Sequence, residues 1–158
     1  MDISFIVDFG STLTGWGKLY QAAAPDDGIT TFQTAGRRTM LIEMAAGVNA
    51  LQWVRQGTLK SVLYFGIEDS PDCCLEDDVL LALARMSRAW LSEGGDIISG
   101  CGAGVSRSSY ASCAILMLVN HYTFDQALAV IRAGRPQANP NSGFVIQLQS
   151  MQTILDQA

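Results

Sequence analysis

The chain has 158 residues, a formal net charge of −5 and 49% apolar residues, while charged residues make up only 16%. This composition is typical of a globular protein and excludes a disordered one, and the length fits one domain over residues 1–158. The acidic balance argues against nucleic acid and anionic membranes as partners, and no apolar run reaches the length of a membrane span.

The N-terminal residues carry no basic segment and include Asp2 and Asp8, which argues against a secretory or transit peptide. We therefore expect a cytoplasmic protein, or a nuclear one. In such a compartment the cysteines are expected to be thiols. They are Cys73, Cys74, Cys101 and Cys113. A single histidine and the lack of a Cys-x-x-Cys pair argue against structural zinc, and no cofactor is expected.

Short apolar segments in the first half of the chain predict strands. Ile3–Val7 alternates between apolar and polar residues, as an edge strand does, and Ile29–Thr34 also fits a strand. The segment Gly10–Gly28 is rich in Gly and Ala and predicts irregular structure. Apolar residues at helical spacing predict a helix over Met40–Gln56, and the apolar run Val62–Ile67 predicts a buried strand.

The second half reads as helices separated by one strand. Leu75–Ser92 predicts an amphipathic helix. Its expected inward face is Val79, Leu80, Leu83, Met86 and Leu91. Ile97–Ser99 predicts a strand, and helices are predicted over Ser106–Asn120, Thr123–Ala133 and Gly143–Gln157. Strands alternating with helices indicate an α/β fold, with a central, mainly parallel sheet of about four to five strands flanked by helices.

The segment Asp96–Ser108 carries the strongest functional signal. A buried strand, a loop containing Gly100, Gly102 and Gly104, and a helix follow one another. Glycines allow backbone conformations in which successive N–H groups converge on one point, and the N-terminus of the helix adds further donors and the positive end of its dipole. The loop therefore predicts an anion site of the size of a phosphate.

Cys101 and Arg107 bracket this anion site. A positive field favours the nucleophilic thiolate, and a guanidinium can bind two phosphate oxygens as a fork. A cysteine with an arginine six residues later occurs by chance in many proteins, so the spacing alone is weak. The complete string from Cys101 to Ser108 is more specific, and it is not a Walker A loop because no Lys-Ser/Thr follows the glycines.

Cys101–Ser108, which reads Cys-Gly-Ala-Gly-Val-Ser-Arg-Ser, closely resembles the signature of the dual-specificity branch of the protein tyrosine phosphatases. Phe124–Arg132, Asn139–Phe144 and Gln147-Leu148 resemble the last helices of that family and the loop between them. The similarity extends from Val62 to the C-terminus. It implies a phosphatase-type phosphate loop between the last core strand and a helix.

The resemblance also implies a role for each site residue. Cys101 is the nucleophile, and Ser108 assists its departure as a thiolate. The phosphate-binding residues are Gly102, Ala103, Gly104, Val105, Ser106 and Arg107. Asp69, 32 positions before Cys101, is the expected proton donor, with Asp72 as the second candidate. Without the resemblance, Asp69 and Asp72 read equally well as solvated loop charges or helix caps, and Ser108 as an ordinary serine at a helix N-terminus.

The implied activity is hydrolysis of phosphotyrosine and phosphoserine/threonine in proteins through a phosphocysteine intermediate, with a phosphorylated protein as partner. The loop lacks the lysines of lipid-directed relatives, which disfavours a phosphoinositide substrate. The chain has Gly100 where the family usually has histidine, which implies a less strongly activated Cys101. This departure leaves an alternative, a catalytically weak or inactive pseudophosphatase that binds phosphoproteins. A glucan- or nucleotide-directed phosphatase is a more distant alternative.

Overall fold

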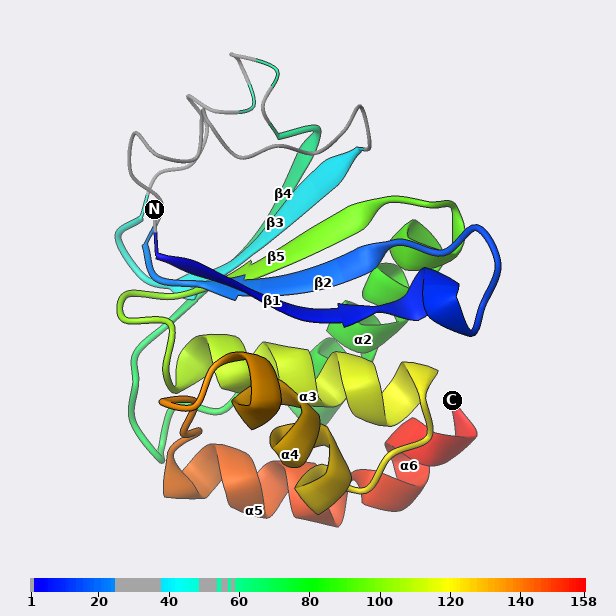
Figure 1. The fold of residues 1–158 in the computed structure, drawn as a ribbon. Coiled ribbons are helices and arrows are strands. Elements are labelled where there is room, and N and C mark those ends of the chain that lie inside the picture. Colours follow the sequence, from blue (N-terminus) through cyan, green and yellow to red (C-terminus); the bar gives the residue numbers. More distant parts are fainter. Residues whose placement is uncertain (1, 25–37, 49–53, 55–56, 58) are drawn as a thin grey trace.

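The computed structural model describes residues 2–24, 38–48, 54, 57 and 59–158, and a five-stranded sheet forms its centre (Figure 1). The strands are β1 (Ile3–Asp8), β2 (Lys18–Ala22), β3 (Thr39–Ala45), β4 (Ser61–Ile67) and β5 (Asp96–Gly100). Their order across the sheet is β1-β2-β5-β3-β4. Only β1 and β2 pair antiparallel, and the other neighbouring strands are parallel. The predicted α/β class with a mainly parallel sheet is confirmed.

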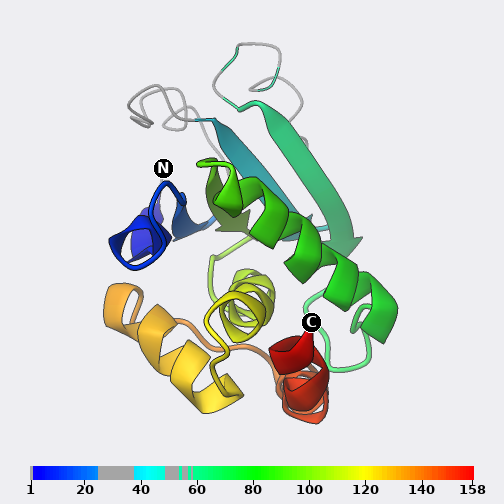
Figure 2. The same ribbon diagram turned by 90° about the vertical axis from the view of Figure 1, so that its right-hand side faces the viewer.

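The helices cover one face of this sheet (Figure 1). They are α2 (Asp77–Ser92), α3 (Arg107–Val119), α4 (Phe124–Gly134), α5 (Ser142–Ser150) and α6 (Gln152–Gln157), and a 3-10 turn, η1 (Phe9–Ser11), follows β1. Figure 2 shows α3 almost end-on, between the sheet and the C-terminal helices. Every residue from Ser108 to Leu118 is buried, so α3 is the central helix of the core. In the described part of the chain, no helix is long and apolar enough to cross a bilayer.

The predicted helix over Met40–Gln56 is wrong in its first part, because Thr39–Ala45 is strand β3. Every residue of β3 is buried. Ile42 belongs to the main core beside α3, whereas Leu41 belongs to a smaller cluster with Ile98. A strand that is buried on both faces has no polar alternation, so its apolar residues also fit a helical spacing. Most of residues 46–56, and the predicted strand Ile29–Thr34, lie outside the described residues.

Three further expectations for element positions need correction. The predicted irregular segment Gly10–Gly28 contains β2, whose pairing with β1 and β5 overrides the weak local signal. The segment Val62–Ile67 is a strand, but it lies at the edge of the sheet, and Tyr64 is exposed. The predicted helix Gly143–Gln157 is divided at the buried Met151 into α5 and α6, which lets both helices pack on α3.

The predicted inward face of α2 is only partly correct. Leu80, Leu83 and Leu91 are fully buried, whereas Val79 and Met86 are exposed. The apolar stripe of α2 is therefore narrower than the sequence suggests. Helix α4 begins with a capping box, since Thr123 accepts a hydrogen bond from the backbone of Gln126 and the Gln126 side chain accepts one from the backbone of Thr123.

Candidate active site

The loop from Cys101 to Ser106 connects the central strand β5 to the N-terminus of α3. Its start is fixed by the sheet, because the Cys101 N–H donates to the Ala22 carbonyl of β2 at 3.3 Å. The side chain of Cys101 is only 2% exposed. The site therefore rests on the buried centre of the sheet, with its cysteine at the carboxyl end of the central strand.

The carbonyl groups of this loop are bonded to residues outside it. The Gly102 carbonyl accepts from Ala24 N at 3.1 Å, and the Val105 carbonyl accepts from Asn139 N at 2.9 Å. In a trans peptide the next N–H points opposite to the carbonyl. The N–H groups after these carbonyls therefore face the interior of the loop, as an anion site requires.

Arg135 holds the middle of the loop from outside, and sequence reasoning did not identify it. It is completely buried, and its Nε donates to the Gly104 carbonyl at 2.6 Å while Nη2 donates to the Ala103 carbonyl at 3.2 Å. The same guanidinium binds both carboxylate oxygens of Asp2, at 3.0 and 2.9 Å, and the Ser4 hydroxyl at 3.0 Å. Strand β1 is thereby tied to the phosphate loop.

Gly104 is required at its position for two reasons. Its φ is +69°, in the left-handed region that favours glycine. A Cβ there would also lie 2.4 Å from Nη2 of Arg135 and 2.7 Å from the backbone of Ala22.

Of the described residues, none accepts a hydrogen bond from the N–H groups of 102–107. These donors, together with the N-terminal end of α3, form a positive cradle in front of Cys101.

Cys101, Ser108 and Arg107 come together at this cradle. The Cys101 Sγ lies 3.3 Å from the Oγ of Ser108, which is completely buried in the first turn of α3. The Arg107 Nη1 donates to the Ile67 carbonyl at 2.9 Å. A Cβ on Gly102 would lie 3.2 Å from Arg107 Nη2, so the guanidinium lies over the start of the loop. The arrangement can hold an oxyanion between a thiol and a guanidinium.

Asp69 is bound directly to the phosphate loop. Its Oδ1 accepts from the Ser106 hydroxyl at 2.7 Å and from Nδ2 of Asn141 at 2.9 Å. The Ser106 hydroxyl in turn accepts from the Asn141 N–H at 2.9 Å. Asp72 shows no such bond within the described residues, since only its N–H is engaged, with Ser70 Oγ at 3.4 Å. Of the two candidate carboxylates, Asp69 is the one next to the loop.

Asn141 is a second site residue that sequence reasoning missed. It precedes α5, and its Oδ1 caps that helix by accepting from Phe144 N at 3.1 Å. The cap leaves the amide nitrogen free to donate to Asp69. An asparagine before an apolar helix predicts the cap, but no local pattern predicts the bond to Asp69, which lies 72 residues earlier.

The acid loop, residues 67–75, carries Asp69, and its far end is anchored by Tyr110 and Gln147. Leu75 N donates to the Tyr110 hydroxyl at 3.2 Å, and Gln147 Nε2 donates to the Leu75 carbonyl at 2.7 Å. The Tyr110 hydroxyl itself donates to Gln147 Oε1, and the ring stacks on Phe144. Desolvation raises the pKa of Tyr110, so it remains a neutral hydrogen-bonding group. Both ends of the acid loop are therefore fixed to the helical layer.

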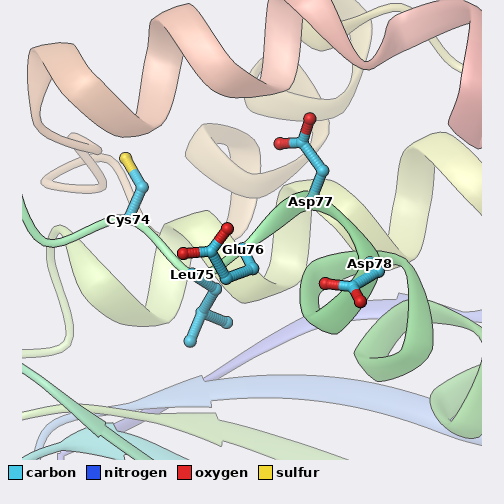
Figure 3. A pocket seen from close by; sticks show the side chains of 5 residues that line it. All are labelled: Cys74, Leu75, Glu76, Asp77 and Asp78. Carbon is cyan, nitrogen blue, oxygen red and sulfur yellow. The ribbon is translucent and has the colours of Figure 1, made fainter.

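An open cavity of about 630 Å³ lies where the acid loop enters α2 (Figure 3). Its lining residues are Cys74, Leu75, Glu76, Asp77 and Asp78. Burial, followed by the negative charges around it, raises the pKa of Cys74, which therefore stays a thiol at neutral pH. None of the lining residues belongs to the phosphate loop. In the described ranges, no group of three or more His, Cys, Asp or Glu side chains could hold a metal ion.

The family model of the dual specificity phosphatase catalytic domain matches residues 20–154. The chain belongs to this family. The crystal structure of a mouse putative dual specificity phosphatase complexed with zinc tungstate superposes with a TM-score of 0.73 and 25% identity, covering 88% of this chain and 84% of that one. Dual specificity phosphatases are cysteine-based protein tyrosine phosphatases, so the resemblance noted in the sequence is confirmed.

Two curated relatives illustrate the extent of the match. Dual specificity protein phosphatase 26 of Mus musculus is 35% identical over 98 residues, which is 61% of this chain and 46% of that protein. The MAP kinase phosphatase with leucine-rich repeats protein 2 of Dictyostelium discoideum is 39% identical over 67 residues, 40% of this chain and 10% of that protein. The chain thus spans less than half the length of either of these two dual specificity phosphatases.

Proposed function

We propose that the chain hydrolyses phosphotyrosine and phosphoserine/threonine in proteins through a phosphocysteine intermediate. The observation that carries this proposal is the cradle in front of Cys101. The carbonyl groups of the loop are bonded to residues outside it, so its N–H groups point inward, and Arg107 lies at one side of the cradle. Such preorganised donors match the oxygens of a transferring phosphoryl group and need no reorganisation during the reaction. A phosphorylated protein is the proposed partner, in the cytoplasm or nucleus.

In the first step, the thiolate of Cys101 attacks phosphorus, the P–O bond to the side chain breaks, and Asp69 gives its proton to the leaving oxygen. The position of Asp69 supports this role, since Ser106 brings its carboxyl to the edge of the loop at 2.7 Å. To act as an acid, Asp69 carries a proton on the oxygen that faces the leaving group. The phosphoryl group then resides on the sulfur of Cys101.

In the second step, Asp69 accepts a proton from water as the water oxygen attacks phosphorus. The P–S bond breaks, phosphate is released, and Cys101 leaves as a thiolate. The hydroxyl of Ser108, 3.3 Å from the sulfur, can donate a hydrogen bond to the developing negative charge. Arg107 and the loop N–H groups hold the three non-bridging oxygens in both steps.

The second candidate function is binding of phosphoproteins without turnover. It is favoured by Gly100, which cannot supply the imidazole that the family usually places before the nucleophile. Such a pseudophosphatase would use the same oxyanion cradle, so both functions require phosphate binding at Cys101. They differ in whether the bound group is transferred.

Hydrolysis of an aryl phosphate in the presence of a chelator separates the two functions. We expect turnover that vanadate inhibits, and no turnover by Cys101→Ser. Phosphopeptides carrying phosphotyrosine or phosphothreonine then test the dual specificity. A parent protein that binds vanadate but releases no phosphate would reject the enzyme and support the binding module.

A further inference from the structure

Glu43 is an acidic residue buried near the carboxyl end of β3, the strand between β5 and β4. Its side chain has no exposed surface, its Oε1 accepts from Ala45 N at 3.0 Å, and its Oε2 has no hydrogen-bond donor among the described residues. Burial raises the pKa of Glu43, and the hydrogen bond from Ala45 N, followed by the attraction of Arg107, offsets part of that rise. A buried carboxyl with an unpaired oxygen is costly, so its presence behind the active site calls for a role.

Gly100 provides the space for this carboxyl. It lies directly opposite Glu43 on β5, one residue before the nucleophile. A Cβ on Gly100 would be 3.5 Å from Glu43 Oε2 and 3.2 Å from a methyl group of Leu41. The distance to Glu43 is an ordinary van der Waals contact and the distance to Leu41 is tight, so a side chain at this position would touch the carboxylate and crowd Leu41. The glycine that departs from the family pattern and the buried glutamate are therefore sterically complementary.

Arg107 also carries an unpaired polar atom. Its Nη1 donates to Ile67, but its Nε is buried without an acceptor in the described part of the chain. No hydrogen bond joins the guanidinium to the Glu43 carboxyl, but the positive charge of Arg107 lowers the pKa of Glu43, and each group retains unused hydrogen-bonding capacity. An oxyanion in the loop would compete with Glu43 for the positive charge of Arg107.

We propose that Glu43 is a positioning residue that acts through Arg107, neutralising the guanidinium while the loop is empty and taking up a proton from solvent when an oxyanion binds. This inference rests on the phosphate-binding site of the proposed function. A bound dianion repels the Glu43 carboxylate, and it also neutralises the positive charge of Arg107 that stabilised this carboxylate. The protonated form of Glu43 therefore becomes more favourable. By linkage, the oxyanion must then bind more tightly as the pH falls.

Other titratable groups face the same region and must be separated from Glu43. Tyr64 of β4 lies beside Glu43 in the sheet, but its side chain is exposed and its hydroxyl accepts from Gly47 N at 3.0 Å. Cys101 follows β5, and Asp69 binds Ser106 of the loop. Both side chains lie at the oxyanion site, so the test uses a protein from which both have been removed.

The experiment is a calorimetric titration of the Cys101→Ser, Asp69→Asn protein with tungstate, in two buffers of different ionisation enthalpy. We expect proton uptake that grows as the pH falls from about 8 to about 6.5, with a dissociation constant about threefold lower at the lower pH. Glu43→Gln added to this protein should abolish the uptake and flatten the pH dependence. Glu68→Gln makes the same chemical change on the exposed acid loop and should leave both unchanged.

Each outcome has a distinct meaning. Tungstate binding without proton uptake, or uptake that persists in Glu43→Gln, overturns the role of Glu43 and leaves the phosphate site intact. Absence of tungstate binding overturns the proposed phosphate site itself. Proton uptake on tungstate binding is first measured in the protein that retains Glu43. Absence of this uptake therefore overturns the role of Glu43 even where Glu43→Gln fails to fold.

Discussion

The hydroxyl of Ser106 donates to the carboxylate of Asp69 across 2.7 Å, and this bond joins the acid loop to the phosphate loop. The two residues come from segments 37 positions apart in the chain. Ser106 immediately precedes the arginine of the phosphate loop, so whatever fixes the loop also fixes the proposed proton donor.

Ser106→Ala should lower kcat about tenfold for an alkyl phosphate, because Asp69 loses one of the two donors that place it. An aryl phosphate with a good leaving group should be affected less, since it depends less on the acid. In an Asp69→Asn protein the same change should have little further effect. Steady-state kinetics of the parent protein, Ser106→Ala, Asp69→Asn and the double variant complete a double-mutant cycle. Equal losses of kcat in both backgrounds would show that Ser106 acts independently of Asp69.

Asn141→Asp should separate the two roles of Asn141. An aspartate still caps α5, so the unfolding free energy should change little, but it replaces the donor to Asp69 by a second carboxylate. We expect kcat to fall by about tenfold while the melting temperature stays near that of the parent protein. Asn120→Asp, which makes the same change at the opposite end of α3, is the matched control. Equal kinetic losses in both variants would contradict the role of Asn141.

Arg135→Met should both destabilise the protein and weaken its anion site. The substitution leaves the Ala103 and Gly104 carbonyls without their donor, and we expect a loss of about 2–4 kcal/mol in unfolding free energy. Arg85→Met changes an exposed arginine in the same way and should cost much less. Denaturant unfolding and tungstate affinity are the measurements. Unaltered tungstate affinity in a folded Arg135→Met protein would show that the hydrogen bonds from Arg135 to the loop do not shape the anion site.

The ion pair between Asp2 and Arg135 should appear in the pH dependence of stability. The hydrogen bond from Arg135 holds the pKa of Asp2 below its usual value. A carboxyl with a depressed folded-state pKa contributes stability above its unfolded-state pKa, and this contribution disappears as the pH falls through the folded-state value. Asp2→Asn should therefore lose less stability than the parent protein on acidification below about pH 4. Parallel acid-unfolding curves for the two proteins would show that the pair contributes nothing.

The phosphate loop could be predicted from sequence because its chemistry is local. Cys101, the glycines and Arg107 lie within one strand–loop–helix segment, and the following helix is buried from Ser108 to Leu118. The supporting residues Asn141, Arg135 and Glu43 could not be predicted in this way. Each reaches the site across a long sequence separation, and its role depends on how distant elements pack.

Strand β3 shows the same limit for the fold. Its seven residues are all buried, so their hydrophobicity carries no period that distinguishes a strand from a helix. What decides is its position between β5 and β4, with the main core on one face and the smaller cluster on the other. The sequence of β3 alone contains neither neighbour, whereas the amphipathic α2 could be recognised from its own pattern.

The most direct test of the account is to trap the phosphoryl group on Cys101. Ser108→Ala removes the hydroxyl that assists the thiolate as a leaving group, so the intermediate should accumulate during turnover of an aryl phosphate. Acid quenching followed by peptide mass spectrometry should find one phosphoryl group on the Cys101 peptide, and none after Cys101→Ser. Turnover with no phosphoryl group on Cys101, or with the group on another residue, would contradict the mechanism.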